Sequence, residues 1–186
     1  YDLMFLYIYF NFSGYTDIAI GMGRLYGWRL CENFNYPFAA RNISQFWRSW
    51  HMSFTFWLQD YIFTPVARWV SLRVKGSPQS RVIVSMTAGS FASMAACGLW
   101  HYFEWRMMLW AALEGAGLMA GVLYAEGMKK AGLDGFHKRL GQSYVYWAVC
   151  AFLAIHFNTW LLPLLLNDFD TAWSVMCRMG GAAATP

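Results

Sequence analysis

The chain has 186 residues, of which 58% are hydrophobic, 20% aromatic and only 13% charged. Soluble domains usually carry about 25% charged residues, so the composition excludes an ordinary soluble fold and predicts an all-α, polytopic transmembrane bundle. The formal net charge of +4 is modest, and no nucleic-acid partner is expected. The four cysteines are single residues without CxxC spacing, so neither a zinc site nor a disulfide framework is expected (Cys31, Cys97, Cys150 and Cys177).

The first residues are strongly apolar. Residues 1–12 are too short to cross a bilayer alone and are expected to be the tail end of a longer helix. Because the chain opens within this apolar run and without methionine, we expect a fragment of a longer multi-span protein. Asp17 is placed to cap a second apolar helix over 18–25, and a functional role for its carboxylate stays open.

A loop and a central helix follow. Residues 31–40 contain asparagines and Pro37 and are expected to form a loop. A helix is predicted over Ile43–Leu58, because apolar residues recur there at helical spacing, with Asn42 as its cap. On this helix His51 would lie beside Trp47 and Leu58, at the border of the apolar and polar faces, where a buried imidazole can still reach a reactant.

Three stretches approach or reach the roughly 20 residues that cross a bilayer core. They are Val82–Trp100, Met107–Tyr124 and Tyr144–Leu166. Some of these stretches are expected to be joined by shorter, possibly re-entrant helices. Before the first span, residues 61–74 are apolar but are expected to be broken at Pro65.

Small residues recur every four positions along the first span, at Ser85, Gly89, Ser93 and Cys97. This period predicts a flat ridge on which another helix packs closely. The ridge continues to His101, so we expect that imidazole to be held rigidly.

Basic residues gather in two loops, 68–81 and 129–139. Two spans separate the loops, so both lie on one side, which the positive-inside rule makes cytoplasmic. The turn that holds His101 and the acidic stretch 167–170 then face the exterior or periplasm.

Three enzymatic chemistries are open for the histidines. A histidine can be the general base for a hydroxyl that attacks an acyl donor. His51 and His101 could also join a carboxylate in a metal site, although no metal-ligand spacing is present. Cys97 and His101 could form a nucleophile pair, although the small-residue ridge already explains the cysteine.

Non-enzymatic roles for the histidines and carboxylates also stay open. The two histidines could simply link helices by hydrogen bonds. Asp17, Glu114 and His156 could serve proton or ion conduction, although single ionisable groups in separate spans do not form an evident relay. His137, in a basic loop, is assigned no role.

Several motifs in order resemble one known family. They are FSGYTDIAIG, ENFNYPF, ISQFWRSWHMS, WLQDYIF and CGLWH. Together they resemble the membrane-bound O-acyltransferase (MBOAT) family, in particular its bacterial branch that O-acetylates alginate or transfers D-alanine to teichoic acid. The resemblance covers about residues 9–121 of a single partial domain, 1–186, which also contains the C-terminal span 144–166.

The resemblance implies a funnel that reaches a buried histidine. It also implies transfer of an acyl group from a cytoplasmic thioester, acetyl-CoA or an acyl carrier, to a hydroxyl group. The histidine of the GLWH motif is His101, the expected catalytic base, and His51 would orient the reactants or stabilise charge on the thioester carbonyl. Asp60 and Asp17 would support local structure. No metal and no tightly bound cofactor are expected.

Four features depart from the family pattern. Tyr102 stands where glycine is usual, Gln59 where arginine is usual, and Glu114 where many relatives carry histidine. The phenylalanine–arginine motif of the last family helix is missing near 160–166. These departures concern the identity of the acceptor and whether the chain has the full activity of the family.

The family resemblance favours O-acetylation of an exported, alginate-type polysaccharide in the bacterial inner membrane. A periplasmic or extracellular acetyltransferase or esterase-like partner is expected. The alternatives are transfer of D-alanine or another acyl group, and a non-catalytic or transporter-like member.

Overall fold

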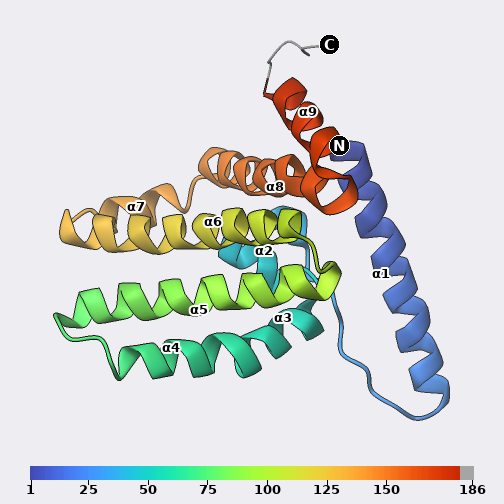
Figure 1. The fold of residues 1–186 in the computed structure, drawn as a ribbon, viewed down its shortest axis with the longest axis horizontal. Helices are drawn as coiled ribbons and strands as arrows, with labels where there is room; N and C mark the ends of the chain where they lie inside the picture. Colours follow the sequence, from blue (N-terminus) through green and yellow to red (C-terminus); the bar gives the residue numbers. More distant parts are fainter. Residues whose placement is uncertain (181–186) are drawn as a thin grey trace.

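The computed structural model describes residues 1–180, except for the side chains of Asp134 and Phe169, and this part of the chain folds almost wholly into helices (Figure 1). A 3₁₀ turn, η1, covers Pro37–Ala39, and a π turn, η2, covers Gln59–Phe63. The α-helices are α1 (Asp2–Leu25), α2 (Ile43–Ser49), α3 (Met52–Leu58), α4 (Thr64–Ser71), α5 (Pro78–His101), α6 (Trp105–Lys130), α7 (Asp134–Leu140), α8 (Tyr144–Leu166) and α9 (Phe169–Met179).

Three helices, α5, α6 and α8, are long and apolar enough to cross a membrane, with mean hydropathies of 1.6, 1.4 and 1.8. The three predicted spans are therefore confirmed, and two of them are longer than predicted. The helix α5 begins early because the Ser77 side chain accepts a hydrogen bond from the Ser80 amide and Pro78 occupies the first turn.

The antiparallel pair α5 and α6 forms the centre of the bundle, with α4 along one side and α8 along the other (Figure 1). The predicted close packing of the small-residue ridge is confirmed. A Cβ atom placed on Gly89 would lie 2.8 Å from the Phe63 ring. One turn before His101, a Cβ atom on Gly98 would lie 2.7 Å from the Met107 carbonyl oxygen.

The N-terminal region forms one continuous helix, α1, so the predicted helix start at Asp17 is wrong. Ser13 and Thr16 donate their hydroxyl groups back to the carbonyls of Phe10 and Phe12 within the helix. Hydroxyl groups bonded in this way are compatible with a helix interior and do not mark a cap. The Asp17 side chain is exposed.

The predicted break at Pro65 and the predicted second basic loop also need correction. The helix is not broken at Pro65, because η2 precedes it and α3, η2 and α4 run on as one irregular helix. A π turn accommodates a proline that has no backbone N–H to donate. The second basic loop is partly helical, since α6 extends to Lys130 and α7 follows.

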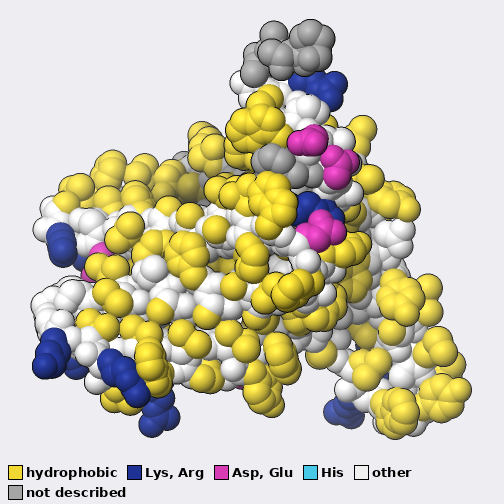
Figure 2. All heavy atoms as spheres, in the orientation of Figure 1, with side chains coloured by type: hydrophobic (Ala, Val, Ile, Leu, Met, Phe, Trp, Pro, Cys, Tyr) yellow, Lys and Arg dark blue, Asp and Glu magenta, His cyan; other side chains and the backbone are white. Residues whose placement is uncertain are grey.

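The two basic segments lie at the same end of the α5–α6 pair, and Lys and Arg side chains gather there on the face shown in Figure 2. The turn after His101 lies at the opposite end. There Arg106, only 9% exposed, pairs with Glu104 and donates to the carbonyl oxygens of Leu164 and Asn167. This arginine ties the start of α6 to the end of α8.

Candidate functional site

The predicted helix over Ile43–Leu58 is interrupted at His51, so the continuous-helix prediction is wrong. Trp50 is extended, and His51 adopts a left-handed conformation with φ 44° and ψ 54°. A non-glycine residue in this region is uncommon and costs roughly 1–3 kcal/mol, so surrounding contacts must hold it. The cap prediction is confirmed, because the Asn42 side chain accepts from the Gln45 amide at 2.8 Å.

The loop 31–40 holds the interruption in place. Asn33 accepts the Met52 amide on its backbone oxygen, and its side-chain oxygen accepts from the Ser53 amide at 3.1 Å and the Ser53 hydroxyl at 2.6 Å. Phe34 and Trp50 form an isolated antiparallel bridge. These partners replace the helical hydrogen bonds lost at the interruption.

The left-handed turn directs His51 toward residues that the helical projection did not predict. Its ring packs against Phe12 of α1 at 4.8 Å between centroids, Phe54 at 5.2 Å and Trp100 at 6.1 Å. The predicted position beside Trp47 and Leu58 therefore needs correction. His51 instead joins α1, α3 and the end of α5.

His101 is the last residue of α5 and is partly buried. Its ring lies 4.9 Å from the Trp100 ring and 5.8 Å from the Trp110 ring, edge-on to both. The structure thus brings the two predicted site residues together around Trp100, which contacts both imidazoles. Their assignment as catalytic residues stays a prediction.

Electrostatics links the two histidines as well. Burial, and then the charge of the nearby His101, lower the pKa of His51 below its ordinary value of 6.5. His51 is therefore neutral at pH 7. A neutral imidazole has one N–H donor and one acceptor nitrogen, so it can donate to a carbonyl oxygen or receive a proton.

The carboxyl group of Glu114 is linked to His101 through two tryptophans. The Glu114 side chain, 1% exposed, accepts a hydrogen bond at 3.1 Å from the indole nitrogen of Trp47. Trp47 packs edge-on against Trp110 at 6.0 Å, and Trp110 in turn packs against His101. Glu114 lies within α6, the second predicted span, but its link to the site through two tryptophans was not predicted.

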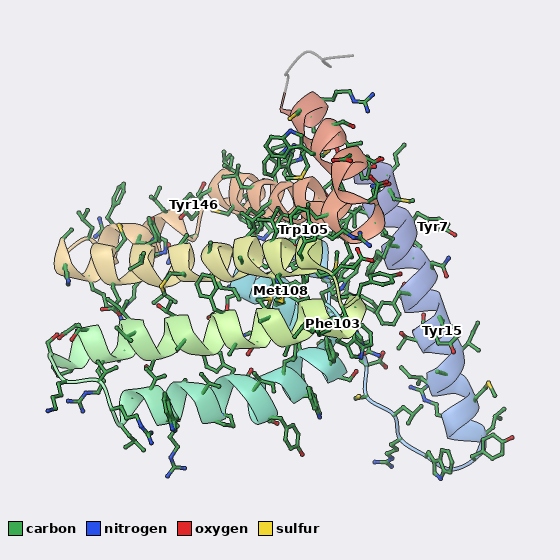
Figure 3. The ribbon with its side chains drawn as sticks, viewed as in Figure 1. Tyr7, Tyr15, Phe103, Trp105, Met108 and Tyr146 are labelled. Atoms are coloured by element: carbon green, nitrogen blue, oxygen red, sulfur yellow. The ribbon has the colours of Figure 1, made fainter. Side chains whose placement is uncertain are left out.

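A cavity of about 1020 Å³ lies between α2, α5, α6 and α8. Its lining begins beside the basic segments, where Tyr146 marks the α7–α8 end in Figure 3, and reaches Trp47 and Ser93. Phe103 and Trp105, which follow His101 in the chain, mark the opposite end of the α5–α6 pair (Figure 3). His51 and His101 do not line the cavity, but Trp47 does, and it contacts Trp110, which in turn contacts His101.

The competing site chemistries gain no support. Within residues 1–180, no three His, Cys, Asp or Glu side chains are grouped as metal ligands. Cys97 is 1% exposed within the α5–α6 contact, and the hydrogen bonds described for the site do not join it to His101. Beyond the histidine, the exposed Tyr102 ring lies 5.4 Å from the guanidinium of Arg106 in the first turn of α6.

The remaining candidates lie elsewhere. The His156 imidazole is half exposed and lies 3.8 Å from the Asp2 carboxylate. His137 contacts the Tyr124 hydroxyl at 3.2 Å at the basic end of the cavity. Asp17 is exposed on α1, so the described residues do not bring Asp17, Glu114 and His156 together as a relay.

These features define a helical membrane protein with two histidines gathered around a tryptophan at the end of a central helix. Residues 3–162 match the family model of the membrane-bound O-acyltransferases. The chain belongs to the MBOAT family, and the resemblance predicted from the motifs is confirmed.

Three relatives are named as acyltransferases. The chain is 37% identical over 111 residues to the probable alginate O-acetylase AlgI of Azotobacter vinelandii. The aligned residues make up 60% of this chain and 20% of the relative. It is 40% identical over 96 residues to the teichoic acid D-alanyltransferase of Bacillus subtilis (52% and 24%). It is 33% identical over 123 residues to the peptidoglycan O-acetyltransferase of Helicobacter pylori (66% and 21%). The chain thus spans between a fifth and a quarter of the length of these relatives.

Proposed function

We propose that this chain is the motif-bearing part of a membrane O-acyltransferase that acetylates hydroxyl groups of an exported, alginate-type polysaccharide. Family membership and the alginate O-acetylase relative support this proposal. The single observation that carries it is the convergence of His51 and His101 on Trp100, at the end of α5.

In this mechanism the acceptor hydroxyl attacks the carbonyl carbon of an acyl thioester. His101 accepts the hydroxyl proton as the ester bond forms, and His51 donates its N–H to the carbonyl oxygen as negative charge develops. The carbon–sulfur bond then breaks, and the proton passes to the leaving thiolate. The neutral state of His51 supports its role as a donor that adds no fixed charge.

The cavity is a suitable entry path for the donor. Its lining reaches His137 in the second basic segment and also includes Arg41 and Arg48. We infer that this end faces the cytoplasm of a bacterial inner membrane, in agreement with the positive-inside rule. Cationic guanidinium groups there favour an anionic thioester donor such as acetyl-CoA or a carrier-bound acyl group.

The acceptor would approach from the opposite end, near the turn after His101. An acetyltransferase or esterase-like protein outside the membrane would then pass the acetyl group on or receive it. Transfer of D-alanine is the second candidate, because the D-alanyltransferase relative shares 40% identity over 96 residues.

The test uses the full-length protein in membrane vesicles with two labelled donors, acetyl-CoA and a D-alanyl carrier protein. The proposal predicts that label from acetyl-CoA appears in alkali-labile ester linkage on unacetylated alginate. Label transferred only from the D-alanyl carrier would favour the second candidate. Absence of transfer from either donor would contradict both and support a non-catalytic member.

A further inference from the structure

Glu114 is a buried carboxyl group that the proposed reaction does not use. It is 1% exposed and lies within a helix long and apolar enough to span the membrane. Placing a carboxyl group at such a position is costly, so an ionisable residue there is a candidate for function. Among the described residues, its hydrogen-bond donor is the Trp47 indole.

The Glu114–Trp47 hydrogen bond reaches the reaction site through ring contacts. Trp47, 9% exposed, meets Trp110 at an interplanar angle of 78°, and Trp110, 4% exposed, meets His101 at 83°. Edge-to-face contacts of this kind prefer a defined geometry. A change in the tilt of Trp47 would therefore be transmitted to the His101 imidazole.

Trp47 also lines the cavity between α2, α5, α6 and α8. The indole is thus part of the wall of the proposed donor path and is linked through Trp110 to His101. Its position affects both how far a thioester can advance and how the histidine ring is oriented. A single hydrogen bond to a fixed acceptor removes the rotational freedom of this large side chain.

We propose that Glu114 is a positioning residue: its carboxyl group holds the Trp47 indole and, through Trp110, the His101 imidazole in one orientation. This inference rests on the proposed acyl transfer for its kinetic consequence. Its structural consequence, a fixed His101 ring, does not depend on the reaction. Hydrogen-bond acceptance is the required property, so glutamine suffices at this position and leucine does not.

The kinetic test compares Glu114→Gln, Glu114→Leu and Trp47→Phe in full-length protein at matched membrane levels. The glutamine variant is expected to keep kcat within about threefold, because its amide oxygen still accepts from the indole. The leucine and phenylalanine variants are expected to lose between about tenfold and a hundredfold in kcat, as misplaced reacting groups do, with a smaller change in the donor KM. The double variant that combines Glu114→Leu with Trp47→Phe is expected to lose no more kcat than the less active of these two single variants.

A matched control uses the same helix. Glu126 pairs with Lys129 at the basic end of α6, far from His101, and Glu126→Leu removes a carboxyl group of equal size. Its kcat is expected to stay at the wild-type value, because the pair lies at the basic end of α6, away from the Trp110 contact with His101. A comparable kcat loss in Glu126→Leu would show that the effect is not specific to Glu114.

A second readout follows His101 directly. Diethyl pyrocarbonate acylates accessible neutral imidazoles, and mass spectrometry gives the rate at each histidine, with the half-exposed His156 as an internal standard. Glu114→Leu and Trp47→Phe are expected to change the His101 rate at least threefold relative to His156, and Glu114→Gln is not. If the wild type transfers no acyl group but these rates behave as expected, the proposed function fails and the positioning role stands.

Two results would overturn the inference. One is a Glu114→Leu protein with normal kcat and a normal His101 rate. The other is a Glu114→Gln protein as inactive as Glu114→Leu, since that would require an ionisable group instead of an acceptor. If Glu114→Leu does not accumulate in membranes, Trp47→Phe and Glu114→Gln carry the same test.

Discussion

The contact between α5 and α6 at Gly98 predicts a large effect from one methyl group. In Gly98→Ala, the new Cβ would lie 2.7 Å from the Met107 carbonyl oxygen and 3.3 Å from the Ala111 Cβ. Reaching an ordinary contact of 3.4 Å requires the helices to separate by about 0.7 Å, and a backbone carbonyl cannot rotate aside as a side chain can. Such overpacking costs about 1–3 kcal/mol of folding free energy.

The separation falls one helical turn from His101, so activity is expected to suffer as well as stability. Since a misplacement of about 1 Å can cost about a hundredfold, we expect kcat to fall between about tenfold and a hundredfold. The assay is acyl transfer by the full-length protein in membranes, with thermal unfolding of purified protein in parallel. Gly127→Ala is the matched control, because its Cβ would meet nothing within 4 Å. A Gly98→Ala protein with wild-type kcat would refute the claim that this contact positions His101.

Two further predictions concern His51. Asn33→Ala removes the acceptor of the Ser53 amide and hydroxyl hydrogen bonds. We expect a loss of about 1 kcal/mol in unfolding free energy, measured by thermal melts, together with reduced acyl transfer. Unchanged acyl transfer would show that the left-handed turn at His51 holds without the Asn33 side chain. Because the pKa of His51 is lowered when folded, the unfolded chain binds its proton first, and stability is expected to fall as the pH drops below 6.5. His51→Gln is expected to flatten that acid-side loss in melts at a series of pH values, and an unchanged slope would contradict the assignment.

Sequence patterns predicted the parts of the structure that depend on composition and short-range periodicity. The three spans follow from apolar length, and the close contact of Gly89 with Phe63 follows from small residues at every fourth position along α5. The cap at Asn42 is a local signal and is confirmed. Each of these features is set by residues near one another in the chain.

The missed features depend on distant contacts. The interruption at His51 is invisible to helical periodicity, because Asn33, 20 residues away, supplies the replacing hydrogen bonds. The Trp47–Glu114 bond joins residues 67 positions apart. The signal that could have found it was an unpaired carboxyl group in one apolar helix and a tryptophan on the buried face of another.

The predicted helix start at Asp17 is wrong for a different reason. Serine, glycine, threonine and aspartate in sequence are typical of a helix boundary, but they are also compatible with a helix interior when hydroxyl groups bond to preceding carbonyls. Thr16 does this with Phe12 at 2.8 Å. The local pattern therefore did not distinguish the two cases.

The most direct test of the central claim compares wild type, His101→Ala and His51→Ala in acyl transfer by full-length protein at matched membrane levels. The account predicts that His101→Ala falls to background, because the general base is lost, and that His51→Ala is reduced but measurable. Transfer that persists at the wild-type rate without His101 would contradict the assignment of this histidine as the base.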